Sequence, residues 1–102
     1  MRKFSALRRI LEDEAILRED EIMSPEEAPW AEIGLAHHDD YLERLRTGGL
    51  GRGEERRLGL PWSPALVRRS RLAANGTVLA GWQALEDGLA ANLAGGTHHA
   101  CP

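Results

Sequence analysis

One short segment of this sequence is typical of a β-strand, whereas the other patterned segments are helical. Residues 90–94 are mostly small and apolar, follow a stop at Gly88, and end at Gly95 and Gly96. They resemble a buried strand, although alanine is a poor strand former. A buried parallel strand needs neighbouring strands to pair with, so one strand cannot make a sheet. We therefore expect an α/β segment that is mostly helical and whose partner strands lie outside these 102 residues.

Apolar residues at helical spacing predict a first helix over residues 3–17, followed by a charged connection over residues 18–23. Ser24 then begins a capping-box pattern with a proline in its first turn. Pro29 would interrupt an established helix, which moves the alternative start to about Ala28. The apolar face of this second helix would hold Trp30, Ile33 and His37.

A third helix is expected to begin at Asp39 and Asp40, which favour a helix start through capping and the helix dipole. Its apolar stripe would comprise Tyr41, Leu42 and Leu45. The Thr-Gly-Gly string at residues 47–49 should end it. Residues 50–61 are rich in glycine and arginine, and we expect a loop there with one helical turn at most, over residues 54–58.

The longest helical pattern covers residues 65–87 and begins at Ser63 and Pro64, a clear start signal. The Asn-Gly pair at residues 75–76 could end this helix early, but the apolar periodicity resumes in phase beyond it and favours a continuous helix. Gly81 lies inside the pattern, where glycine costs about 1 kcal/mol relative to alanine. Close packing against another element would explain a glycine at that position.

Composition predicts a folded chain of a single small domain, with 42% hydrophobic and 28% charged residues. The formal charge of −3 gives no reason to expect nucleic acid or an anionic membrane as a partner. With a single cysteine, Cys101, the chain cannot form an internal disulfide. We find no apolar signal region and no run approaching the roughly 20 residues that span a membrane, so we expect a cytoplasmic protein.

The candidate functional residues follow the predicted strand. Gly95 and Gly96 would allow a sharp turn and a close approach to a ligand, and His98 and His99 could exchange protons near neutral pH. Ligands of open α/β sheets bind outside the carboxyl ends of the strands. Taken by themselves, these residues also fit an ordinary polar loop.

The string LAGGTHHA at residues 93–100 resembles the tandem-histidine motif of the histone deacetylase superfamily, and its upstream neighbours extend the likeness. In the order and spacing of the bacterial, acetoin-utilisation-type branch come the strings GLPWS at 59–63, RRS at 68–70, NGT at 75–77 and ALEDG at 84–88. The resemblance implies that residues 1–102 are a partial N-terminal segment of one deacetylase domain, with the parallel-sheet fold shared by arginases and deacetylases.

By resemblance, the parent domain would be a zinc-dependent enzyme that hydrolyses acetyl amides, either acetyl-lysine or an acetylated polyamine. His98 and His99 would be its catalytic pair, and Gly95 and Gly96 would help to shape the substrate channel. The resemblance leaves its oligomeric state open.

The zinc ligands of the family are an Asp-x-His pair and a later aspartate, which follow the tandem histidines and have no match in this sequence. The family's tyrosine that polarises the substrate carbonyl has no match here either. The His and Asp cluster at residues 37–40 and the His and Cys cluster at residues 98–101 lack typical zinc-ligand spacing. We therefore expect no metal site and no activity from this chain alone. The alternative is a small, non-catalytic helical module that binds a partner through exposed apolar helix faces.

Overall fold

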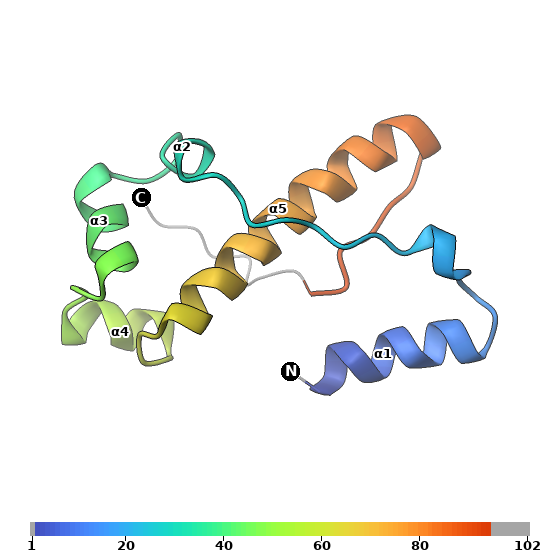
Figure 1. The fold of residues 1–102 in the computed structure, drawn as a ribbon, viewed down its shortest axis with the longest axis horizontal. Helices are drawn as coiled ribbons and strands as arrows, with labels where there is room; N and C mark the ends of the chain where they lie inside the picture. Colours follow the sequence, from blue (N-terminus) through green and yellow to red (C-terminus); the bar gives the residue numbers. More distant parts are fainter. Residues whose placement is uncertain (1, 95–102) are drawn as a thin grey trace.

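The computed structural model describes residues 2–94, and these residues form helices joined by extended segments. The elements are α1 (Arg2–Asp13), the short 3-10 helix η1 (Glu19–Glu21), α2 (Trp30–Ile33), α3 (Asp39–Thr47), α4 (Arg52–Leu58) and α5 (Pro64–Asp87). The long helix α5 runs diagonally through the molecule, with α2, α3 and α4 gathered beside its first half and α1 lying apart from that group (Figure 1). The mostly helical character predicted from the sequence is confirmed for the described residues.

Helix α5 is the continuous helix that the sequence predicted. The hydroxyl oxygen of Ser63 accepts a hydrogen bond from the backbone N–H of Leu66 at 3.0 Å, and Pro64 occupies the first turn, where its missing N–H is no loss. The helix passes through the Asn-Gly pair without a break and ends at Gly88. Gly88 has φ 88°, a left-handed conformation that glycine adopts without steric strain.

Helix α3 also begins and ends where it was predicted, although its capping differs. The N-cap residue is His38, whose side chain makes no capping hydrogen bond. Asp39 and Asp40 lie in the first turn, where their negative charge still favours the positive end of the helix dipole. The helix ends at Gly48, which has φ 87°.

The predicted bounds of the first two helices are wrong. Helix α1 ends at Asp13 rather than at residue 17, and the chain leaves the helix through Ala15, whose φ of 56° is left-handed. Helix α2 begins only after Pro29, which is extended at φ −60° and ψ 142°. Residues 22–29 are not helical, so neither Ser24 nor Ala28 starts a helix. Pro29 has no N–H to donate within a helix that begins at Ser24. Because α2 ends at Ile33, His37 lies outside it.

The predicted loop over residues 50–61 contains a complete short helix, α4. Glutamates occupy its first turn and arginines its last, which suits the helix dipole at both ends. The backbone N–H of Gly51 donates to the Glu54 carboxylate at 3.3 Å, which completes the N-terminal cap. The sequence pattern underestimates the length of α4 because glycines stand at both of its ends.

The strand predicted over residues 90–94 is absent from the described structure, where these residues are irregular. A strand exists only where another strand accepts and donates its backbone hydrogen bonds, and residues 2–94 contain no other strand. The parallel sheet implied by the resemblance is therefore not seen in the described part of the chain. No helix in that part is both long and apolar enough to cross a membrane.

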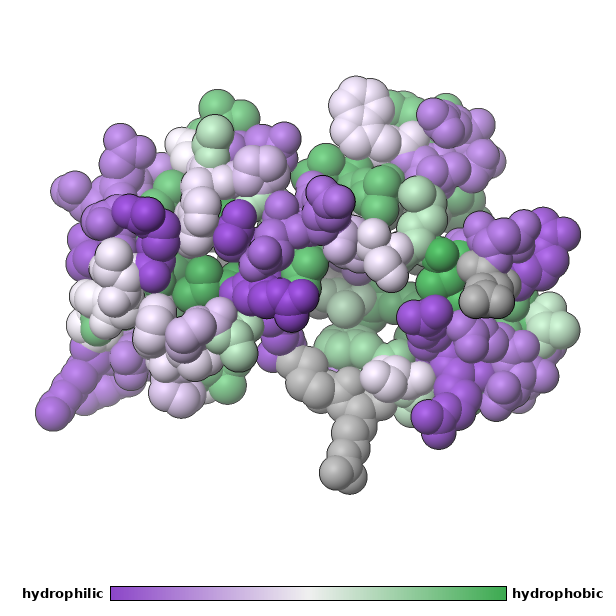
Figure 2. All heavy atoms as spheres, in the orientation of Figure 1, coloured by the Kyte–Doolittle hydropathy of each residue, from purple (hydrophilic) through white to green (hydrophobic). Residues whose placement is uncertain are grey.

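The buried core of the described residues is small, comprising Ala28, Leu42, Leu50 and Val67. Large apolar side chains of the C-terminal half of α5 and just beyond it are exposed instead, namely Trp82 (68%), Leu85 (79%) and Leu89 (84%). Figure 2 shows hydrophobic residues interspersed with hydrophilic ones on one face of the molecule. The radius of gyration is 15.5 Å, whereas a compact chain of this length has about 13 Å. The molecule is therefore elongated and sparsely packed.

We expect the isolated chain of 102 residues to lose its helical circular-dichroism signal gradually on heating. Cooperative unfolding requires a core whose parts depend on one another, and four buried apolar residues provide little of that coupling. The measurement is a thermal melt at a concentration where sedimentation shows a monomer. A sharp, reversible transition of that monomer would contradict the prediction.

Candidate functional site

The predicted site residues Gly95, Gly96, His98 and His99 lie outside the described residues, so their roles stay predictions. The structure does describe how the chain approaches them. Beyond Gly88 the chain turns back beside α5, as the orange and red segment in Figure 1 shows. Residues 89–94 thus return from the end of α5 toward its middle.

Asn92 attaches this returning segment to α5. Its amide nitrogen Nδ2 donates to the backbone carbonyl of Ala73 at 3.0 Å and lies 3.1 Å from the hydroxyl of Thr77. Its amide oxygen Oδ1 accepts a hydrogen bond from the backbone N–H of Ala94 at 3.2 Å. One short side chain therefore links the helix to the backbone that leads to the predicted catalytic pair.

Gly76 provides the space for this contact. It is buried on α5, and a Cβ atom built on it would lie 2.8 Å from Nδ2 of Asn92. Gly81 has no comparable contact among the described residues. Apart from the neighbouring backbone of α5 itself, no described atom lies within 4 Å of a Cβ built there. The helix therefore carries a close approach at Gly76, and close packing within residues 2–94 does not explain the glycine at position 81.

Another irregular segment, residues 26–28, binds the same stretch of α5. Arg71 exchanges two hydrogen bonds with Ala28: its Nε donates to the Ala28 carbonyl at 2.9 Å, and the Ala28 N–H donates to the Arg71 carbonyl at 3.2 Å. The amide of Asn75 donates to the Glu26 carbonyl at 2.9 Å. The Arg71 guanidinium also lies 4.6 Å from the centre of the Trp30 ring, within the range of a cation–π interaction.

Helices α3 and α4 are joined by a two-point ion pair. The Arg44 guanidinium donates to the two carboxylate oxygens of Glu54 at 3.1 and 3.0 Å. This hydrogen bonding, together with the backbone N–H of Gly51, lowers the pKa of Glu54 below its ordinary value. The same pair raises the pKa of Arg44.

Trp62 fastens the start of α5 to α3. Its indole N–H donates to the backbone carbonyl of Leu45, and its ring lies against Gly48, where a Cβ would come within 3.2 Å. Together with the ion pair, this contact fixes α3 beside the first half of α5, where the two helices pack together.

The cluster at residues 37–40 does not gather into a metal site. The rings of His37 and Tyr41 lie 5.8 Å apart between centroids, so His37 packs beside α3. Across residues 2–94, no three histidine, cysteine or acidic side chains come close enough to hold a metal ion. The described part of the chain therefore does not fit a zinc centre.

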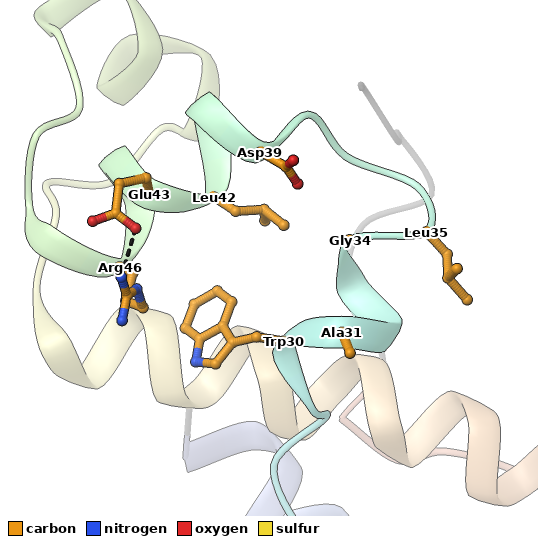
Figure 3. A pocket seen from close by; sticks show the side chains of 8 residues that line it. All are labelled: Trp30, Ala31, Gly34, Leu35, Asp39, Leu42, Glu43 and Arg46. Carbon is orange, nitrogen blue, oxygen red and sulfur yellow. Dashed lines mark hydrogen bonds and ion pairs between the residues drawn. The ribbon is translucent and has the colours of Figure 1, made fainter.

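A surface hollow of about 450 Å³ lies between α2 and α3. Trp30 and Leu42 face one another across it, and the ion pair of Glu43 with Arg46 borders it (Figure 3). Its lining combines apolar side chains with the carboxylates of Asp39 and Glu43, and it lacks a histidine. The hollow could accept a small apolar group, and it does not carry the predicted proton-transfer chemistry.

Sequence reasoning missed Asn92 and Arg71, the two side chains that do most to hold extended segments on α5. One signal was present, because glycine within a long helix is unfavourable unless something approaches it closely. The signal applies equally to Gly76 and Gly81, and the sequence alone does not distinguish them. The pairing of Gly76 with Asn92 depends on the reversal of the chain after α5.

Comparison with known proteins assigns the chain to a family. The family model described as the histone deacetylase domain matches residues 1–102. An uncharacterized protein of Picosynechococcus sp. (strain ATCC 27264 / PCC 7002 / PR-6) is 40% identical over 102 residues, which are 100% of this chain and 34% of that protein. The chain thus spans about a third of the length of the curated relative it matches. No solved structure matches the sequence significantly.

Replacing Arg44 by glutamine should raise the pKa of Glu54 toward its ordinary value of 4.5, because the main hydrogen bond to the carboxylate is lost. The pair stabilises the contact of α3 with α4 above pH 4.5, and this contribution is lost as the pH falls through the lower pKa of the folded state. A carbon-13 NMR titration of the Glu54 carboxyl in the full chain measures the shift.

The matched control is Arg46→Gln, because Arg46 lies on the same helix but pairs with Glu43. The Glu54 titration should be unchanged in this variant. Identical Glu54 titrations in the parent chain and in both variants would show that α3 and α4 are not joined as described.

Proposed function

The chain belongs to the histone deacetylase family, and we propose that it supplies the tandem-histidine segment of a zinc-dependent enzyme that hydrolyses acetyl amides. The match of the family's domain to residues 1–102 carries this proposal. Within that match, His98 and His99 are the side chains best suited to the chemistry. The chain spans 34% of its relative, so the activity of a whole protein is part of the proposal.

Hydrolysis of an acetyl amide requires a proton to move from water to the departing amine. Water adds to the carbonyl carbon of the acetyl group, the C–N bond of the amide breaks, and acetate and a free amine are released. Imidazole has an ordinary pKa of about 6.5, so it can accept a proton from water and later donate one to nitrogen. In the proposal, His98 and His99 perform these transfers, while Gly95 and Gly96 allow the substrate to approach the backbone closely.

Zinc in this family would polarise the acetyl carbonyl and activate the water. We assign none of its ligands to residues 2–94, because no suitable group of side chains gathers there. The proposal accordingly places the metal ligands in other parts of the protein. Substrates of the acetyl-lysine and acetylpolyamine classes both suit this chemistry, and we propose a cytoplasmic setting with no role for nucleic acid or a membrane.

A second candidate function is a non-catalytic interaction module derived from the family. The exposed apolar side chains favour it, above all Leu35, Trp82, Leu85 and Leu89, because a partner could bury them. This module would bind a protein and would not need its tandem histidines. The effect of removing those histidines therefore separates the two functions.

The test is a hybrid protein in which these 102 residues replace the matching part of the Picosynechococcus relative. We expect the zinc-loaded hybrid to hydrolyse acetyl-lysine peptides or acetylated polyamines. His98→Ala and His99→Ala should each lower kcat at least 100-fold, because acid–base catalysis contributes about 10²–10⁴-fold to a rate. The assay follows release of acetate.

His38→Ala is the matched control, since His38 is an exposed histidine that makes no side-chain cap, and its activity should equal that of the hybrid. The chain of 102 residues by itself should show no turnover. Full activity of the hybrid after loss of either histidine of the pair would contradict the proposal. An inactive hybrid beside an active relative, or a relative with no action on either substrate class, would also contradict it.

A further inference from the structure

We propose that Asn92 is a positioning residue for the tandem histidines, holding the segment that leads to them on the middle of α5. This inference rests on the proposed function of His98 and His99. It adds a residue that has no part in proton transfer and acts through the backbone. The supporting observations are the hydrogen bonds of one amide group and the glycine beneath it.

The hydrogen bonds described for Asn92 join α5 to the backbone that follows it. Its Nδ2 bonds the Ala73 carbonyl and the Thr77 hydroxyl on one side, and its Oδ1 accepts from the N–H of Ala94 on the other. A side-chain amide carries both an NH₂ group that donates two hydrogen bonds and an oxygen that accepts, and these contacts use both groups. An ionised aspartate would keep the acceptor and place negative charge against the Ala73 carbonyl.

The helix is shaped to receive this side chain. Gly76 lies between the two acceptors in sequence, and a Cβ there would lie 2.8 Å from Nδ2 and 3.1 Å from the amide carbon of Asn92. Asn92 could yield to such an atom only by giving up its bonds to Ala73 and Thr77. Glycine is unfavourable inside a helix, and at position 76 the missing Cβ leaves the space that the Asn92 amide occupies.

The anchor lies close in sequence to the residues it would position. Ala94, whose N–H is bound by Asn92, is separated from His98 by residues 95–97 alone. The other polar contacts in the middle of α5 hold residues 26–28, which precede α2. Asn92 is therefore the described side chain through which α5 can set the position of the histidine segment. A displacement of about 1 Å at a catalytic group can cost roughly 100-fold in rate.

The experiment uses the zinc-loaded hybrid protein and the variant Asn92→Leu, which keeps the branched shape and removes the three hydrogen bonds. We expect kcat to fall about 10- to 100-fold while KM changes less than about twofold, because the catalytic groups are displaced but the substrate-binding groups remain. Asn92→Asp should also lower kcat. The pH dependence of kcat/KM should keep its shape in both variants, since His98 and His99 are still present.

Asn75→Leu is the matched control. Asn75 also uses its amide nitrogen to bind a backbone carbonyl, that of Glu26 at 2.9 Å, from the neighbouring position on α5. This variant should lower the melting temperature of the hybrid and leave kcat within about twofold. A kcat for Asn92→Leu that falls no further than that of Asn75→Leu would show a merely structural role and overturn the inference.

Thr77→Val tests the inference if Asn92→Leu prevents folding. It removes one of the two partners of Nδ2 with little change in shape, and we expect a loss of kcat of about threefold to tenfold. An unchanged kcat in this variant would overturn the inference. If His98→Ala and His99→Ala leave the activity of the hybrid unchanged, the proposed function itself is refuted. If these two variants lose activity but Asn92→Leu does not, only the role of Asn92 is refuted.

Discussion

Hydrogen bonds between side chains and backbone carbonyls fasten two irregular segments of this molecule to the middle of α5. Arg71 and Asn75 bind residues 26–28, and Asn92 brings the chain beyond Gly88 back to Ala73. With so small a buried core, apolar packing alone specifies little about where these irregular segments lie. Directional bonds provide that specificity, since a misplaced segment would leave polar groups unpaired.

The same helix divides the molecule into a braced part and an open part. Beside its first half, the Arg44–Glu54 ion pair joins α3 to α4, and the Trp62 contact holds α3 against the start of α5. Toward its C-terminal end, apolar side chains such as Trp82 and Leu85 remain exposed. In the proposed deacetylase, the rest of the domain would bury these side chains, whereas in the interaction module a separate protein would do so.

Local signals predicted the helices whose ends carry them. Ser63 and Pro64 start α5, and the acidic residues at the start of α3 place that helix correctly. Prediction failed where a distant contact or a missing partner decides the structure. Residues 90–94 have the composition of a buried strand, but no strand lies beside them in the described chain. Helix α4 is longer than the single turn predicted over residues 54–58, because its terminal charges suit a short helix despite the glycines that flank it.

The sequence by itself determined the family, the tandem histidines at positions 98 and 99, and the long helix that precedes them, because these features are encoded in adjacent residues. Only the tertiary structure decided that Asn92 meets Gly76, and that the close approach to α5 occurs there rather than at Gly81. The physical reason is the left-handed turn at Gly88. That turn reverses the chain, so residues that precede Gly88 contact residues that follow it. No local sequence pattern predicts such a contact.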